Sequence, residues 1–213
     1  MRIWLLAALI GTHAVTAFPA LAQKSPEKIR LTAASKDGAV LIRVPVEPFA
    51  YSLQFSRNGN SGFMSRVYLM TIKGGAAGYR FIARTLSPGR YRLDSIWQQG
   101  HWSACLEQGT FEFEVKAGTI SYVGTLQTER LLASIQMQAL LSGKATVLGT
   151  DYMLSHGPTE KPIIDGRDEI ALAEARQFAD TTMNGSARLV DLANVTDTRF
   201  TTSGFGKAIK ICG

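Results

Sequence analysis

Short runs of β-forming residues, separated by turn residues about every eight to twelve positions, constrain this chain more than any other feature. In the clearest run, Phe111-Glu112-Phe113-Glu114-Val115, apolar and acidic side chains alternate. Successive side chains of a strand point to opposite faces, so this run predicts a strand with one face in a core and one in water. Further strands are expected at 28–34, 39–46, 50–56, 64–72, 78–85, 91–97 and 120–124. Such a series predicts a mainly β chain folded as an antiparallel β-sandwich, with a barrel as the alternative.

Turn residues indicate how these strands connect. Asp37-Gly38 predicts a hairpin between the first two runs, and Pro88-Gly89 leads the chain into the run 91–97. Pro45 marks an edge strand or a strand end, because proline has no backbone N–H to donate. Alternation places two sets of side chains on one face each: Val40, Ile42, Val44 and Val46 in one strand, and Tyr91, Leu93, Ser95 and Trp97 in the other. Two later runs, 130–139 and 145–153, are expected to be extended, with a helix over 129–141 as the alternative.

The last part of the chain has a helical pattern. Asp165 is expected to be the N-cap of a helix that ends at Asn184-Gly185. The residues spaced to form one apolar helix face are Ala171, Leu172, Ala175, Phe178, Ala179 and Thr182. A single amphipathic helix cannot bury this face alone, so it is expected to pack on the sandwich. The sequence therefore predicts a β-sandwich domain over 23–154 and a C-terminal helical extension with a tail over 155–213.

The first 22 residues have the three parts of a secretory signal peptide. Arg2 supplies the positive charge, 3–10 form an apolar stretch, and Ala20-Leu21-Ala22 provides small residues before the expected cleavage site. The apolar stretch is well short of the roughly 20 residues that a membrane-spanning helix needs. No cysteine follows the cleavage site for lipid attachment. The mature protein is therefore expected to be periplasmic or secreted, without a transmembrane segment.

Both cysteines, Cys105 and Cys212, lie in the mature chain. In an oxidising compartment, an even pair is most simply a disulfide. Such a bond would tie the C-terminal tail to the middle of the sandwich. Two free thiols, or an intermolecular link through Cys212, are the alternatives.

The net charge is +6, with 23 Lys and Arg residues against 17 Asp and Glu residues. The basic residues are scattered and form no stripe, which favours an ordinary solvated surface. An exported chain of this kind is not expected to bind nucleic acid. Weak attraction to anionic envelope surfaces stays open.

One set of motifs resembles a known group of domains. Pro88-Gly89-Arg90-Tyr91-Arg92-Leu93 is followed by Phe113-Glu114-Val115-Lys116-Ala117-Gly118 and then by Tyr122-Val123-Gly124. This pattern resembles the prealbumin-like β-sandwich domains of exported bacterial envelope proteins and lipoproteins of unknown function. The resemblance covers about 38–126 and implies a prealbumin-like or immunoglobulin-like sandwich. It implies no catalytic residue, and the chain departs from many members of the group by lacking an acylated cysteine.

Motifs for catalysis are weak. The mature chain has two histidines, His101 and His156, and contains no Gly-x-Ser-x-Gly, His-Glu-x-x-His or Cys-x-x-Cys pattern. His101 and Cys105 have helical ligand spacing, and a metal site there would need Met137, Met153 or His156 to complete it. We therefore expect no catalytic residue, cofactor or metal. The alternative is a metal-dependent or hydrolytic periplasmic enzyme that uses His101 and His156.

The segment 97–102 is the candidate binding loop. Its residues are Trp97, Gln98, Gln99, Gly100, His101 and Trp102. Indoles, amides and an imidazole around a glycine are typical of surfaces that stack on and hydrogen-bond to sugars or proteins. In the alternative interpretation, Trp97 continues the inward face of its strand and Trp102 covers the disulfide. The sequence thus predicts a non-enzymatic envelope module whose partner is a protein or a glycan.

Overall fold

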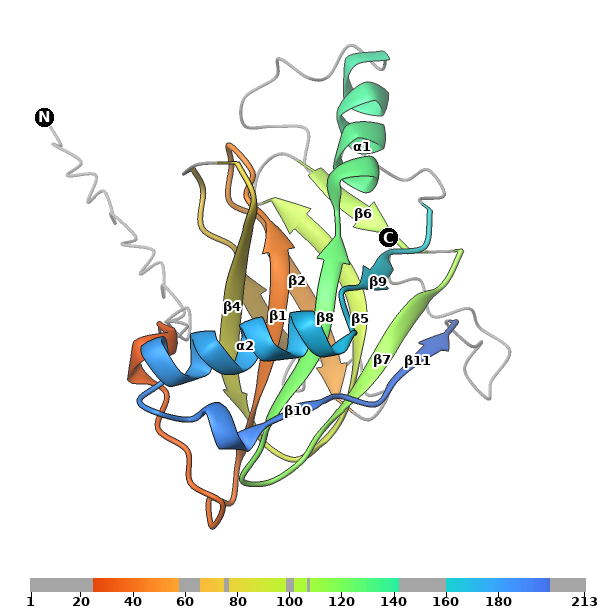
Figure 1. The fold of residues 1–213 in the computed structure, drawn as a ribbon. Coiled ribbons are helices and arrows are strands. Elements are labelled where there is room, and N and C mark those ends of the chain that lie inside the picture. The colour runs from red at the N-terminus through yellow and green to blue at the C-terminus, as the bar shows by residue number, and fades with distance from the viewer. Residues whose placement is uncertain are drawn as a thin grey trace, which may run out of the picture.

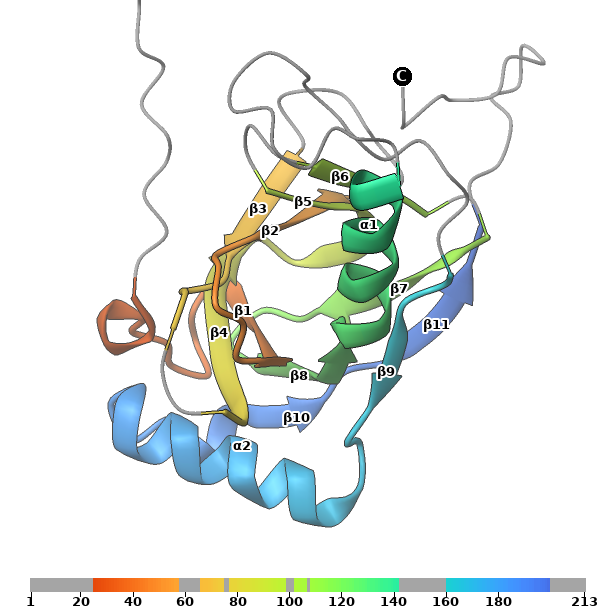
Figure 2. The same cartoon turned by 90° about the horizontal axis from the view of Figure 1, so that it is seen from above.

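Two β-sheets pack face to face, and a helix lies on the outer face of one of them (Figures 1 and 2). The structure, a computed structural model, describes residues 25–57, 66–74, 77–98, 102–106, 108–141 and 160–199. The predicted mainly β, two-layer architecture with a packed helix is confirmed. The predicted leader, the run 145–153 and the segment 200–213 lie outside the described residues.

One sheet is mixed. Its strands are β1 (Gly38–Pro45), β4 (Tyr79–Leu86), β8 (Ile120–Gln127), β9 (Ile163–Asp165) and β10 (Val190–Leu192). The order is β10-β8-β1-β4, and β9 pairs with the second half of β8. β1 is antiparallel to β4 but parallel to β8, and β10 is also parallel to β8. The prediction of a purely antiparallel sandwich is therefore wrong for this sheet. Parallel neighbours need long crossover connections, which local turn signals do not indicate.

The other sheet is antiparallel. Its strands are β2 (Ser52–Arg57), β3 (Arg66–Met70), β5 (Gly89–Gln98), β6 (Trp102–Cys105), β7 (Thr110–Val115) and β11 (Val195–Thr198). The order is β11-β7-β5-β2-β3, and β6 pairs with the second half of β5. The C-terminal segment 160–199 thus adds strands to both sheets, with β9 and β10 on β8 and β11 on β7.

The predictions of a strand at 28–34 and of a hairpin turn at Asp37-Gly38 are wrong. The expected strand at 28–34 is absent from the described structure, where Pro26–Lys28 form a short 3₁₀ helix, η1. Asp37-Gly38 is not a hairpin turn, because Gly38 already begins β1. A Cβ atom at Gly38 would overlap the carbonyl oxygen of Lys116, so close approach of two backbones explains this glycine. A glycine after an aspartate can mark either a turn or a close approach of two backbones, and the local sequence does not distinguish these two cases.

Apolar side chains fill the space between the sheets. Phe113 lies at the centre of an aromatic group, with ring centroids 5.4 Å from Phe55 and 5.9 Å from Tyr91. Val40, Ile42 and Val44 of β1, which were predicted to share a face, belong to the same core. The alternation of β7 is also confirmed, because Phe111, Phe113 and Val115 are buried.

Helix α2 (Glu169–Thr182) covers a second apolar layer on the outer face of the mixed sheet. The buried residues on the helix are Ala171, Leu172, Ala175 and Ala179, four of the six predicted for its apolar face. They pack against Ala39, Leu41, Ala83, Ile120 and Tyr122 of the sheet. β1 is therefore buried on both faces, as expected of an interior strand with a parallel neighbour.

The helix ends are placed partly as predicted. Asp168, not Asp165, is the N-cap of α2, and its side chain accepts a hydrogen bond from the backbone N–H of Ala171 at 2.8 Å. Asp165 instead ends β9. Asn184 and Gly185 have φ values of 61° and 71°, which confirms the predicted stop.

A second helix, α1 (Glu129–Leu141), follows β8 directly, so the helical alternative for 129–141 is correct and the extended one is wrong. Leu131 and Leu132 of its first turn are buried in the core between the sheets. No helix in the described part of the chain is long and apolar enough to cross a membrane.

A bulge in β5 changes the predicted face of two residues. Ser95 pairs with Gln54 and Leu93 pairs with Phe55, so Asp94 is the extra residue. Tyr91 and Leu93 face the core as predicted, but beyond the bulge it is Ile96 that joins the core. Ser95 and Trp97 therefore do not share the inward face, because one inserted residue reverses the alternation.

Candidate functional site

The predicted binding loop is described only at its two ends. Trp97 and Gln98 end β5, Trp102 begins β6, and Gln98 pairs with Trp102 across this hairpin. Gln99 and His101 lie outside the described residues. The prediction that these side chains form one binding site stays a prediction.

Trp97 can be examined further. Its ring meets the ring of Tyr68 edge-on, with centroids 6.1 Å apart. Its indole N–H is buried and has no hydrogen-bond partner in the described part of the structure. The alternative in which Trp97 continues the inward face of Tyr91 and Leu93 is wrong, because the bulge at Asp94 intervenes.

The other predicted residues remain untested. His156 and Cys212 lie outside the described residues, so neither the pair His101 and His156 nor the disulfide to Cys105 is placed. Cys105 ends β6, where it pairs with Ser95. Among the described residues, no group of three His, Cys, Asp or Glu side chains could hold a metal ion.

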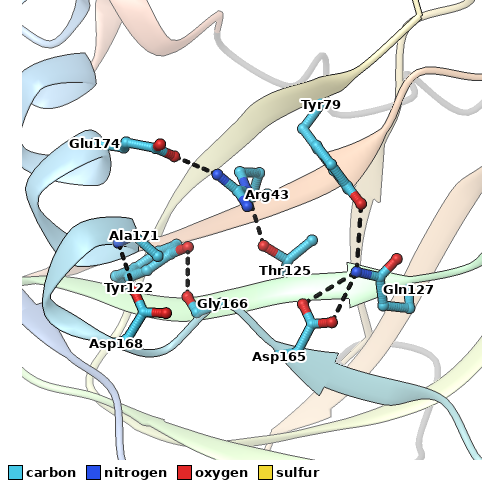
Figure 3. Close-up of polar contacts among 10 residues, drawn as sticks. All are labelled: Arg43, Tyr79, Tyr122, Thr125, Gln127, Asp165, Gly166, Asp168, Ala171 and Glu174. Atoms are coloured by element: carbon cyan, nitrogen blue, oxygen red, sulfur yellow. Dashed lines mark hydrogen bonds and ion pairs between the residues drawn. The ribbon is translucent and has the colours of Figure 1, made fainter.

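The described structure instead brings together a polar surface that the sequence did not predict. It lies on the outer face of the mixed sheet, on the part that α2 leaves uncovered (Figures 1 and 3). We call it the polar shelf and define it by Arg43, Tyr79, Thr125, Gln127, Asp165 and Glu174. These residues come from β1, β4, β8, β9 and α2, so five elements meet at the surface.

Arg43 is the centre of the polar shelf. Its Nε donates to the hydroxyl of Thr125 at 2.8 Å, and its Nη1 forms an ion pair with Glu174 of α2. Its guanidinium carbon lies 4.7 Å from the centre of the Tyr79 ring, in cation–π geometry. One side chain, 20% exposed, therefore joins two neighbouring strands to the helix.

Gln127 holds the opposite side of the polar shelf. Its amide nitrogen donates to both carboxylate oxygens of Asp165, at 2.9 and 3.1 Å, and lies 3.5 Å from the hydroxyl of Tyr79. In the antiparallel pairing of β8 with β9, Gln127 lies opposite Ile163, and Thr125 lies opposite Asp165. Tyr79 and Ile163 are exposed, at 48% and 52%. The shelf thus combines fixed polar groups with accessible apolar surface.

The turn between β9 and α2 lies between Asp165, at the end of β9, and the helix that carries Glu174. Gly166 has a φ of 57°, and its carbonyl accepts a hydrogen bond from the hydroxyl of Tyr122 at 3.0 Å. A Cβ atom at Gly166 would lie 2.6 Å from the Thr125 hydroxyl oxygen, so this turn requires glycine. Burial raises the pKa of Tyr122 above its ordinary value of 10.0, so the hydroxyl, which is protonated at neutral pH in any case, remains a donor in more basic solution.

Arg167 fastens the same turn to the sheet. It donates to the carbonyl of Val123 at 2.6 Å and to that of Ala193 at 2.7 Å. Val123 lies between the segments of β8 that pair with β10 and with β9, and Ala193 directly follows β10. Desolvation lowers the pKa of Arg167, although the guanidinium stays charged. Its charge is directed into the fold rather than to the polar shelf.

Sequence reasoning missed the polar shelf because its members are far apart in the chain. Arg43 and Thr125 meet only through the parallel pairing of β1 with β8. The one local signal was a lone arginine within the apolar run 39–46. A charged residue in such a run predicts a partner but does not identify it.

Comparison of the chain with protein-family models, with curated proteins and with solved structures finds no match. The resemblance to prealbumin-like domains therefore stays a prediction.

Replacing Arg43 with methionine should lower the free energy of unfolding by about 1–2 kcal/mol, because a half-exposed ion pair and a cation–π contact are lost together. Urea unfolding would measure the change. Arg90→Met is the matched control, since Arg90 pairs with Glu112 but its side chain is 65% exposed. Equal effects of the two variants would show that Arg43 does not hold α2 to the sheet.

Proposed function

We propose that the protein is an exported, non-enzymatic module of the bacterial envelope that binds another macromolecule. The observation that carries the binding role is the polar shelf, where exposed Tyr79 and Ile163 lie beside hydrogen-bonded Gln127 and Asp165. These polar groups come from different strands and are already held by one another. A partner that meets such a preorganised surface has little side-chain entropy to remove.

The proposal also covers the cellular location of the protein and the type of its β-sandwich. Export is inferred from the leader over 1–22, and the mature protein is periplasmic or secreted. The predicted disulfide between Cys105 and Cys212 would suit an oxidising compartment. The motif from Pro88 to Gly124 supports a prealbumin-like sandwich, to which the mixed sheet adds parallel strands.

Among the described residues, the exposed groups of the polar shelf suit binding, whereas the one contact that resembles an activated nucleophile is buried. The hydroxyl of Ser56 donates to Asp94 at 3.0 Å, which is the kind of contact that activates a nucleophile. Both residues are buried, at 0% and 1% exposure, so this pair is closed to a substrate. The enzymatic alternative depends on His101 and His156, which lie outside the described residues, so it stays a prediction.

Capture from envelope extracts tests the function. The mature protein would be immobilised and compared with Tyr79→Ala combined with Ile163→Ser. We expect at least a tenfold loss of the captured partner, with only a small fall in melting temperature because the contact between Tyr79 and Arg43 is lost. Leu192→Ser on β10 is the matched control, because Leu192 is a 40% exposed apolar residue outside the shelf.

The variant His101→Ala combined with Trp102→Ala tests the loop predicted from the sequence. If this variant loses the partner and the Tyr79 variant retains it, the partner binds the loop and the shelf assignment is wrong. If the unchanged protein captures no macromolecule under any condition, the binding function itself is wrong.

A further inference from the structure

The outer face of the antiparallel sheet is buried without a described cover. α2 lies on the other sheet, and no helix or strand among the described residues lies over the outer face of β2, β5 and β7 (Figures 1 and 2). The side chains of this face alternate with the core residues of the same strands, except at the bulge of β5. Its buried polar residues are Ser52, Ser56, Asp94, Ser95 and Thr110.

Exposure falls steeply along β5 on this face. The side chain of Arg90 is 65% exposed, whereas that of Arg92 is 11% exposed. Both lie on the outer face, because they flank the core residue Tyr91. A long side chain that lay flat on an open sheet would keep one side in contact with water. The low exposure of Arg92, together with the buried and unpartnered indole N–H of Trp97, therefore indicates that further chain covers this end of the face.

The segment 200–213 begins at the buried end of the face. β11 ends at Thr198, which pairs with Thr110 of β7, and the hydroxyl of Thr110 donates to the carbonyl of Leu93 on β5. Neighbouring strands lie about 4.8 Å apart, so about 14 Å separates β11 from β2. An extended chain over 200–212 can span up to about 43 Å, at about 3.3 Å per residue. The segment is therefore long enough to cross the buried positions and to return toward β5 and β6.

Cys105 offers a point of attachment on the same sheet. It ends β6 and lies opposite Ser95 of β5, and residues paired in this way share a face. Cys212 is the other cysteine of the mature chain and lies near the end of the segment 200–213. A disulfide between the two would hold the segment over the end of the face where Asp94 and Ser95 are buried.

The connection 58–65 is the other candidate for the cover. It joins the ends of β2 and β3 beside Ser56. A connection of this length that folds back reaches at most about 13 Å, whereas Ser52 lies about 16 Å from that end of β2. The connection therefore does not account for the burial of Ser52, or of Thr110 two strands away. The connection 142–159 joins α1 to β9, and neither belongs to this sheet.

We propose that the segment 200–213 folds across the outer face of the antiparallel sheet and is fastened there by a disulfide between Cys212 and Cys105. The contact lies within one chain and does not depend on the proposed binding function. The two thiols give two protons and two electrons to an external disulfide, which leaves as two thiols. Because Trp97 begins the predicted binding loop, the fastened segment would restrict access to that loop.

Tryptophan fluorescence of the mature chain tests the cover. Trp97 and Trp102 are its two tryptophans, so Trp102→Phe leaves Trp97 as the only emitter. In this background, removal of 200–213 combined with Cys105→Ser should raise the acrylamide quenching constant of Trp97 at least twofold. Its emission should also shift to longer wavelength, because the indole becomes hydrated. Cys105→Ser alone is the matched control for the substitution, and circular dichroism would confirm that each variant is folded.

Trypsin tests the fastening without removing any residue. Lys207 and Lys210 are cleavage sites within the segment. We expect cleavage there to be at least tenfold faster in Cys212→Ser than in the oxidised wild type. Dithiothreitol should bring the wild type to the rate of the variant and should leave the variant unchanged. Cleavage after Arg90, which lies within β5 and is 65% exposed, should be the same in all samples and controls for general unfolding.

Three results would overturn the inference. The first is unchanged quenching of Trp97 after removal of 200–213. The second is exposure of Trp97 when 58–65 is replaced by Asn-Gly but not when 200–213 is removed, which would make that connection the cover. The third is a dimer linked through Cys212 on a non-reducing gel, or two free thiols in the oxidised protein. Failure of the binding function would appear in the capture experiment and would leave this inference intact.

Discussion

Replacing Phe113 with alanine should lower the free energy of unfolding by about 3–5 kcal/mol, the usual cost of removing a buried phenylalanine. Phe113 is 1% exposed. Its ring packs edge-on against Phe55 and stacks on Tyr91, with centroid distances of 5.4 and 5.9 Å. These residues come from three strands of one sheet, so the cavity would loosen the centre of the core.

Urea unfolding monitored by circular dichroism would measure this loss. Glu114→Ala is the matched control, because Glu114 is the next residue of β7 and faces outward. Its substitution should change the free energy of unfolding by less than about 0.5 kcal/mol. A loss below about 1 kcal/mol for Phe113→Ala would contradict the placement of this ring in a close-packed core.

Replacing Asp94 with alanine should cost about 3 kcal/mol, because removal of one member of a buried ion pair leaves the other charge without that partner. Asp94 is 1% exposed, and its Oδ1 accepts hydrogen bonds from Arg92 at 2.9 Å and Ser56 at 3.0 Å. The side chain of Arg92 is 11% exposed. The substitution therefore removes two hydrogen bonds at the bulge of β5.

The pH dependence of this effect has a definite sign. Burial raises the pKa of Asp94 above its ordinary value of 3.8, against the opposing effects of Arg92 and Ser56. The folded protein therefore binds this proton more tightly than the unfolded chain. Stability relative to Asp94→Asn should fall as the pH rises from about 3.8 to the pKa of the folded state.

Thermal unfolding of the wild type, Asp94→Asn and Asp94→Ala between pH 3 and pH 7 would test both expectations. The asparagine variant keeps an acceptor for Ser56 and Arg92, so it should be more stable than the alanine variant. If the two variants were equally stable, or if the wild type gained stability relative to Asp94→Asn with rising pH, the account of this carboxyl would be wrong.

These two residues show what the sequence could and could not predict. The inward position of Phe113 follows from strict alternation, which needs only the neighbouring residues. The burial of Asp94 depends on a bulge, where one inserted residue reverses the faces beyond it. Nothing in the letters around Asp94 marks that insertion, so Ser95 and Trp97 were assigned to the wrong face.

Helix α2 likewise has features that could be predicted from local sequence and one that could not. The apolar face of α2 and its stop at Asn184 were predictable, because both depend on local spacing and on the left-handed backbone that follows the last turn. The sequence predicts the N-cap of α2 at Asp165 rather than at Asp168, because both are aspartates that precede the apolar pattern. Pairing of Asp165 with Thr125 on β8 decides between them.

The polar shelf was beyond prediction for a different reason. Arg43, Thr125 and Glu174 are distant in the chain, and their contacts depend on the parallel pairing of β1 with β8 and on the placement of α2 over that sheet. Parallel pairing joins strands that no short turn connects. A surface made this way is visible only once the topology is known.

The parallel neighbours of β8 also set the order in which this protein can assemble. β8 has β1 on one side, from early in the chain, and β9 and β10 on the other, from late in the chain. The loop-closure entropy of such distant pairings must be overcome before they stabilise the sheet, so acquisition of the native state should take milliseconds to seconds. Until the last segments arrive, the backbone amides and carbonyls along one side of β8 face solvent, and during that interval chaperones and proteases would recognise the nascent polypeptide.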